Sequence, residues 1–148
     1  YKEDEKMALR MSAFVFSQNL REYQEKALSG ENIDYCGTKT VCGFGVHLTA
    51  GEDFFIPFVD CANDCNTSNH KLTGSDLELT KIAFGPKVKI CSMTDNGLDV
   101  LFAPPDPVVY LNNEKWLAGE KSINLCLKAD ISQIKTIKLN YAGKIEIQ

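Results

Sequence analysis

Six cysteines are the residues of this 148-residue chain whose chemistry is easiest to interpret. They are Cys36, Cys42, Cys61, Cys65, Cys91 and Cys126. An even number of cysteines in a chain this short indicates three disulfides and an oxidising compartment, such as a bacterial envelope or the cell exterior. Zinc binding is the alternative, although the C-x₅-C and C-x₃-C spacings match the usual C-x₂-C thiolate pairs poorly.

The cysteine spacing also suggests a pairing. Cys36 and Cys42 enclose a short loop, as do Cys61 and Cys65, so each of these pairs is close enough in the sequence to bridge locally. Cys91 and Cys126 then remain for a long-range bridge. Each falls on the polar side of an alternating segment ("KVKIC", "INLCLK"), so we expect both on solvent-facing sides of neighbouring strands. Other connectivities stay open, because six cysteines can pair in many ways.

The two histidines show no catalytic pattern. His47 lies in a strand-like segment and His70 in a polar loop, and neither has a serine or cysteine nearby in a nucleophile setting. The sequence also lacks the motifs of nucleotide-binding loops, zinc proteases and serine hydrolases. We therefore expect structural or surface histidines, no cofactor, and a protein that is not an enzyme.

The segment "DCANDCNTSN" gathers oxygen-bearing side chains around two of the cysteines. They are Asp60, Asn63, Asp64 and Asn66. The segment lacks the spacing and the glycine of an EF-hand loop. A solvated loop held by disulfides is expected, with calcium binding at residues 60–66 as the alternative.

Two further features near the C-terminus have both a binding and a structural interpretation. Trp116 is either an exposed recognition aromatic or a side chain packed at a sheet edge. Lys135, Lys138 and Lys144 form either a small basic patch for DNA or part of a solvated sheet face. The net charge of −4 gives no general attraction to phosphate backbones, so nucleic acid is not expected as a partner.

A long helix precedes all of these residues. One apolar seam recurs at steps of three and four residues through Leu9, Ala13, Phe16, Leu20, Tyr23 and Ala27. Good helix formers fill the segment and Gly30 supplies a stop, so Ser29 to Asn32 is the predicted exit turn. Its first half carries a second apolar stripe, which consists of Met7, Met11, Phe14 and Val15. This stripe either belongs to a well-buried helix or is exposed and contacts other copies or a partner.

Beyond residue 42 the apolar period changes to two. Short β-rich segments are predicted at residues 43–49, 53–59, 77–84, 87–93, 98–103, 122–129, 134–140 and 143–148. Asn96-Gly97 and Ala142-Gly143 are predicted hairpin turns, and residues 103–107 ("APPDP") a stiff connection. We predict one α+β domain over residues 1–148. Its long N-terminal helix (1–30) packs on an antiparallel β-sheet in a disulfide-braced head (31–148).

Four segments in this order resemble the H-type minor pseudopilins and FimT-like minor pilins of type IV pilus and type II secretion systems. They are "FSQNLREYQEKALSG", "GFGVHLTAGEDFFIPFVDC", "LFAPPDPVVYLN" and "KTIKLNYAGKIEIQ". The closing hairpin segment is the most specific of them.

The resemblance implies a structural subunit of a filament at the cell surface. Members of the family begin with a cleaved leader and an apolar transmembrane segment continuous with the helix. The resemblance thus implies that such a segment precedes Tyr1 and anchors the subunit in the inner membrane before assembly. Its partners would be other pilin or pseudopilin subunits, touching at the second apolar stripe. A DNA-binding minor pilin of a competence system and a secreted disulfide-rich adhesin or effector are the alternatives.

Overall fold

A computed structural model describes residues 2–29, 35–74, 76–104 and 108–148. The chain begins with one long helix, α1 (Lys2–Leu28), and continues almost entirely as strands. In chain order the later elements are β1 (Thr40–Thr49), β2 (Phe54–Ala62), the short 3₁₀ helix η1 (Cys65–Thr67), β3 (Leu77–Glu78), β4 (Ile82–Ala83), β5 (Val88–Met93), β6 (Gly97–Ala103), β7 (Val108–Leu111), β8 (Glu114–Lys115), β9 (Glu120–Leu127), β10 (Ile134–Asn140) and β11 (Ile145–Ile147).

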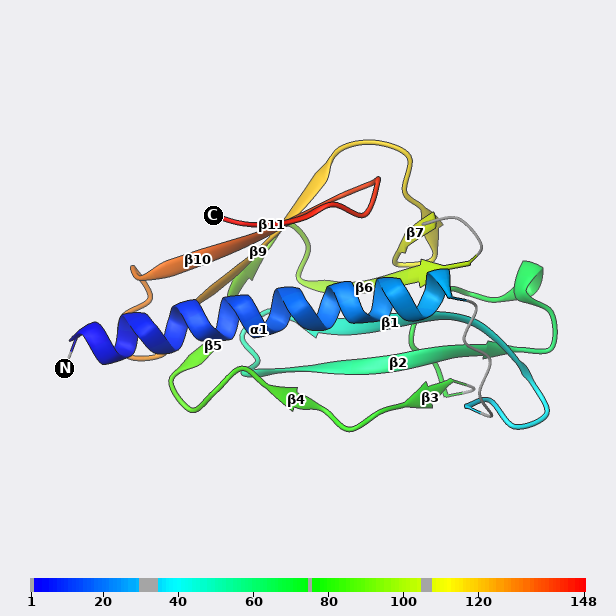
Figure 1. Cartoon of the computed structure of the whole chain (residues 1–148), viewed down its shortest axis with the longest axis horizontal. Coiled ribbons are helices and arrows are strands. Elements are labelled where there is room, and N and C mark those ends of the chain that lie inside the picture. The colour runs from blue at the N-terminus through cyan, green and yellow to red at the C-terminus, as the bar shows by residue number, and fades with distance from the viewer. Residues whose placement is uncertain (1, 30–34, 75, 105–107) are drawn as a thin grey trace.

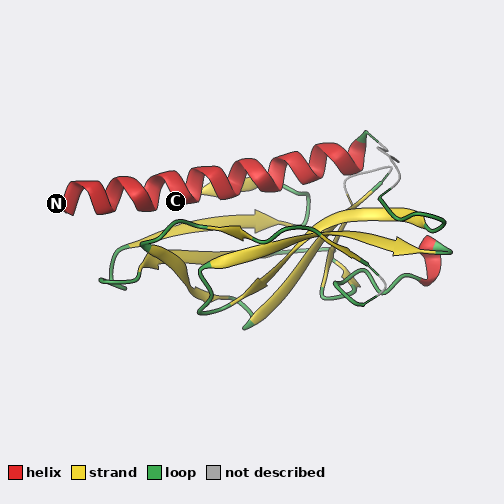
Figure 2. Cartoon of the chain, turned by 90° about the horizontal axis from the view of Figure 1, so that it is seen from below, coloured by secondary structure: helices red, strands yellow, loops and turns green. Residues whose placement is uncertain are grey.

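The strands form two antiparallel sheets. The larger has the order β3-β2-β1-β6-β7-β8, with β4 also pairing β2, and the smaller has the order β11-β10-β9-β5. Helix α1 lies across both sheets as a separate layer (Figures 1 and 2) and contacts β1 and β6 of the larger sheet and all four strands of the smaller one. The predicted α+β architecture is therefore confirmed, although its strands divide between two sheets.

The predicted apolar seam of α1 is the side that packs on the sheets. All six of its residues are buried, and the core beneath them draws on both sheets. Phe16 lies in an aromatic cluster with Phe55 and Phe84, with ring centroids 5.0 and 5.4 Å from its own. Edge contacts of this kind stabilise a core beyond simple area burial.

Side-chain hydrogen bonds fix the helix along its length. Near its middle Ser12 donates its hydroxyl to the carbonyl of Phe84. Farther on, Arg21 Nη2 donates to the carbonyl of Ile145 at 3.0 Å, and Gln24 donates to the carbonyl of Gly143. Both of these acceptors belong to the C-terminal hairpin. The helix is thus attached to the last strand by directional bonds as well as by packing.

One of the two predicted hairpins is confirmed. Ala142 and Gly143 connect β10 to β11, which pair, and Asn140 Oδ1 accepts from the backbone N–H groups of Ala142 and Lys144 at 3.0 and 2.9 Å. The hairpin predicted at Asn96-Gly97 is wrong, because the strands on either side of it, β5 and β6, belong to different sheets. That turn carries the chain from one sheet to the other.

The remaining segments mostly follow the predicted order. The segment predicted at 77–84 forms two short strands, β3 and β4, along the edge of β2. Strands β7 and β8 were not predicted. The exit turn at Gly30 to Asn32 and residues 105–107 of the predicted connection lie outside the described residues.

The structure forms three disulfides, but only one predicted pair is correct. Cys91 bridges Cys126 as expected. The two local pairs are wrong, since Cys36 bridges Cys61 and Cys42 bridges Cys65, with Cα–Cα distances of 5.5 and 5.3 Å. The register of β1 on β2 places Val41 opposite Cys61. Adjacent strands therefore bring these cysteines closer than the short loops along the chain do.

The environment of the third bridge also differs from the expectation. Cys126 is fully buried rather than solvent-facing. Cys91 lies where the register of β5 on β9 shifts, between Ile90 and Ser92, so it is the extra residue of a bulge. A bulge turns a side chain away from simple alternation, which explains why the alternating pattern does not describe the environment of Cys91.

Candidate functional site

The second apolar stripe of α1 lies on the surface. Its exposed fractions are 54% for Met7, 52% for Met11, 51% for Phe14 and 46% for Val15. Met7, Met11 and Phe14 follow one another at steps of four and three residues, so they lie in one row along the helix. Residues between them, such as Leu9 and Ala13, are buried against the sheets. We call Met7, Met11, Phe14 and Val15 the outer apolar stripe.

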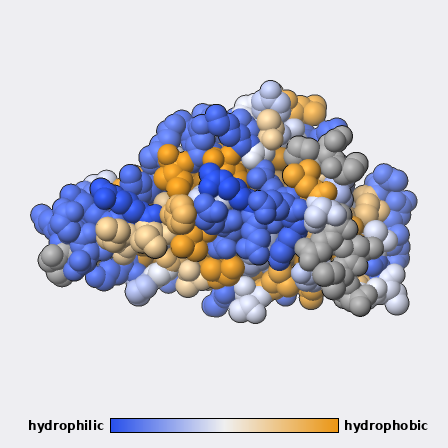
Figure 3. Space-filling view, in the orientation of Figure 1, coloured by the Kyte–Doolittle hydropathy of each residue, from blue (hydrophilic) through white to orange (hydrophobic). Residues whose placement is uncertain are grey.

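The outer apolar stripe ends within the helix. One turn beyond Phe14 the same row continues with Gln18, Glu22 and Glu25, all of them exposed. Glu22 forms an ion pair with Lys26 at 3.6 Å, as expected for a solvated helix face. Figure 3, which views the molecule from the helix side, shows hydrophilic side chains at the N-terminal end, apolar ones toward the middle of the helix, and polar ones along its C-terminal half. Apart from Leu28 in the last turn, the exposed large apolar side chains of the helix therefore lie between Met7 and Val15.

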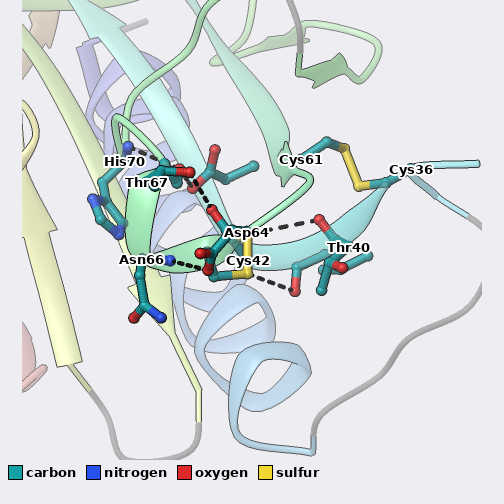
Figure 4. Close-up of a disulfide and its surroundings, with 12 residues drawn as sticks. Cys36, Thr40, Cys42, Cys61, Asp64, Asn66, Thr67 and His70 are labelled. Carbon is teal, nitrogen blue, oxygen red and sulfur yellow. Dashed lines mark hydrogen bonds between the residues drawn. A yellow bond between two sulfur atoms is a disulfide. The ribbon is translucent and has the colours of Figure 1, made fainter. Parts of the chain in front are cut away.

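The acidic loop is a strap over the opposite face of the larger sheet. We use this name for residues 63–74, which Cys65 attaches to β1 through its bridge to Cys42 (Figure 4). At its other end the His70 ring stacks on Tyr110 of β7, with centroids 3.7 Å apart. Since β6 lies between β1 and β7 in the sheet, the strap crosses β6.

The carboxylates of this region have structural partners. Asp64 caps the short helix η1 by accepting from the N–H of Asn66 at 3.0 Å. Asp60 is buried beneath the strap and accepts from the hydroxyl of Ser68 at 2.5 Å. Burial, with Asp76 nearby, raises the pKa of Asp60 to about 6. This carboxyl group therefore titrates in a mildly acidic range.

The described residues provide no ligand set for zinc or for calcium. All six cysteines form disulfides, so none is available to zinc as a thiolate. Over residues 2–29, 35–74, 76–104 and 108–148, no three His, Cys, Asp or Glu side chains gather in a way that could hold a metal ion.

His47 lies on the outer face of the larger sheet. It is paired across strands with Asp99, whose carboxylate bonds Nδ1 of the ring. This hydrogen bond is the main cause of a raised pKa for His47. Thr49 Oγ1 lies 3.4 Å from the other ring nitrogen. These three side chains stand on the neighbouring strands β1 and β6.

The structure does not gather the three C-terminal lysines into one basic patch. Lys135 and Lys138 are three residues apart on β10, so they point to opposite faces of the sheet. Lys138 pairs with Glu120 at 3.4 Å, and Lys144 pairs with Glu146 at 2.8 Å. These lysines alternate with carboxylates, which weakens the field that they present to a phosphate backbone.

Trp116 follows β8 and is partly buried against the core. Its indole Nε1–H donates to the carbonyl of Ala118 at 2.7 Å. Trp116 is thus intermediate between the two alternatives, an exposed recognition aromatic and a side chain packed at a sheet edge.

In the part of the chain that the structure describes, no helix is both long enough and apolar enough to cross a membrane. The comparisons with known proteins are also negative, since no family model, curated protein or solved structure matches this chain.

Proposed function

We propose that this protein is a structural subunit of a type IV pilus or a type II secretion filament, which assembles through the N-terminal half of α1. The observation that carries the proposal is the outer apolar stripe. Its four side chains are about half exposed on a helix whose opposite side is buried from Leu9 to Ala27. Exposed apolar side chains that lie together on one element mark a contact surface.

The proposed occupant of this surface is the same half of α1 in neighbouring copies. Helices with an apolar row at steps of three and four residues pack side by side by interlocking their side chains. Withdrawing the exposed half of each stripe residue from water contributes about 1 kcal/mol. One contact is therefore weak, and an ordered filament requires many repeated contacts along its length.

The distribution of polar groups favours this geometry. Gln18, Glu22 and Glu25 continue the same row and would have to lose water if the C-terminal half of the helix were also packed between subunits. In the proposed filament the outer apolar stripe faces the interior, and the two sheets form the outer layer. The three disulfides keep the head rigid in an oxidising environment at the cell surface.

The sequence resemblance supports the same function and supplies its cellular setting. It implies inner-membrane anchoring before assembly and other pilin or pseudopilin subunits as partners. The alternative of a DNA-binding minor pilin remains a prediction. The ion pairs of Lys138 and Lys144 do not favour it.

Charge substitutions on the stripe test the proposal. We expect the double variant Met11→Glu/Phe14→Glu to be absent from filaments sheared off the producing cells, because assembly would bury two carboxylates without partners. Its melting temperature should stay within a few degrees of the native value, since both side chains already contact water.

Gln18→Glu is the matched control, because it adds a carboxylate one turn along the same helix face. This variant should assemble normally. A Met11→Glu/Phe14→Glu protein that enters filaments as well as the control does would contradict the proposal.

A further inference from the structure

A pocket of about 540 Å³ lies beside Trp116, between β8, the segment that leads into β9, and the turn after β5. This volume falls within the roughly 300–1,000 Å³ of small-molecule sites. Trp116 lines the pocket and is partly buried against the core, while Glu114, Lys115 and Glu120, which also line it, are exposed. The pocket therefore offers one aromatic surface surrounded by charged and polar groups.

Backbone contacts hold the walls of this pocket in place. The N–H of Trp116 donates to the carbonyl of Val109 at 2.9 Å, and its indole is fixed by the bond to Ala118. On the adjoining wall, the side chain of Asn112 accepts from the N–H of Asp99 at 2.8 Å. A site whose walls are fixed before binding loses little entropy when a ligand enters.

The charges around the pocket nearly cancel. Asp95 pairs with Lys121 at 3.3 Å, and Glu120 pairs with Lys138 at 3.4 Å. Glu114 and Lys115 remain, adjacent on β8 and opposite in sign, and no ion pair involves either among the described residues. A strongly charged ligand would meet no complementary field here, whereas a neutral ligand with many hydroxyl groups would meet both donors and acceptors.

We propose that this pocket binds a neutral oligosaccharide. A pyranose ring has an apolar C–H face that packs on an indole, and a rim of hydroxyl groups that bond to carboxylates and ammonium groups. Trp116 supplies the packing surface, and Glu114, two residues before it and on the same side of the strand, supplies carboxylate oxygens that accept hydrogen bonds from the sugar. This binding activity does not depend on filament assembly, so the two proposals succeed or fail separately.

The position of the pocket agrees with such a role. Along the long axis of the molecule, β7 lies toward the C-terminal end of α1, whereas the outer apolar stripe lies in its N-terminal half (Figure 1). A contact that buries the stripe would leave the pocket open. A folded monomer and an assembled filament are thus both expected to bind the sugar.

Trp116 is the sole tryptophan of the chain, so its fluorescence reports directly on the pocket. The folded protein is titrated to millimolar concentrations with three probes, the linear trisaccharides of N-acetylglucosamine, glucose and mannose. With at least one probe we expect a saturable change in emission and reduced quenching by acrylamide. The absence of any saturable change with all three would overturn the proposal.

A pair of variants then assigns the binding to this pocket. Glu114→Ala should weaken the affinity for the active trisaccharide roughly tenfold, which corresponds to the loss of one hydrogen bond to a charged group. Glu25→Ala, which removes an exposed carboxylate of α1, should leave the affinity unchanged. Equal affinities for the two variants, in proteins of unchanged melting temperature, would place the sugar elsewhere and contradict the proposal.

Discussion

The burial of Asp60 under the strap makes the stability of the fold depend on pH. Its pKa rises from the ordinary 3.8 to about 6, chiefly because the carboxylate is removed from water. In the folded state the group therefore keeps its proton to a higher pH than in the unfolded state. Relative to neutral pH, the Asp60 carboxyl therefore raises the free energy of unfolding below about pH 4. This contribution is lost as the pH rises through 6, and at neutral pH the full cost of burying the charged carboxylate remains.

The variant Asp60→Asn should remove this penalty. Asparagine retains an acceptor for the Ser68 hydroxyl but carries no charge to desolvate. We expect the variant to be more stable than the native protein at pH 7.5, by on the order of 2 kcal/mol, and to lose this advantage near pH 4. Urea denaturation at several pH values measures the difference.

Asp64→Asn is the control for this experiment, since Asp64 is exposed in the strap that covers Asp60 and asparagine is also a good cap. Its stability should follow that of the native protein across the pH range. An Asp60→Asn variant that behaves in the same way would show that burial of Asp60 carries no electrostatic cost.

At the scale of elements, the disulfides Cys36–Cys61 and Cys42–Cys65 hold the strap and the start of β1 on the larger sheet. Cys42–Cys65 closes a loop with a sequence separation of 23 residues and is the disulfide that joins the strap to β1. Without this bridge, noncovalent contacts such as the His70–Tyr110 stack and the Asp60–Ser68 bond must hold the strap.

Replacing both Cys42 and Cys65 with alanine should lower the free energy of unfolding by roughly 3 kcal/mol, the value expected for a loop of this length. Limited proteolysis should then cut first within the strap. Replacing Cys91 and Cys126 instead should cost a similar free energy but leave the strap protected. Equal protection of the strap in both double variants would contradict its dependence on the Cys42–Cys65 bridge.

The sequence predicted the positions of the helix and most strands better than it predicted which strands lie next to one another. The period of α1 identified every buried residue of its seam, because a long helix on a core repeats one signal many times. Strands β7 and β8 are short and follow a proline-rich segment, so their signal was weak. The Asn96-Gly97 turn has the composition of a hairpin, and its sequence carries no information on which sheet each flanking strand joins.

The candidate sites were predictable to different degrees for related reasons. Helix geometry alone separates Met11 and Phe14 from the buried seam, so the outer apolar stripe is visible in the sequence. The disulfide pairs depend on the register between β1 and β2, which local spacing does not contain. The pocket at Trp116 combines segments from three places in the chain, so only the folded structure brings its walls together.

At the scale of the whole molecule, the two surfaces that the proposals use lie on different parts of the fold. The outer apolar stripe lies on the N-terminal half of α1, and the braced sheets carry the pocket and the strap. The central claim is that the stripe is exposed in the monomer and buried between subunits in a filament. Two of the chain's three methionines, Met7 and Met11, belong to the stripe, which provides a chemical probe of this claim.

Hydroxyl-radical footprinting measures the claim most directly, by the rate at which each methionine is oxidised to its sulfoxide. In the purified monomer Met7 and Met11 should react faster than the partly buried Met93. In filaments we expect the rates of Met7 and Met11 to fall at least several-fold while that of Met93 stays unchanged. Met7 and Met11 that react equally fast in both states would contradict the account.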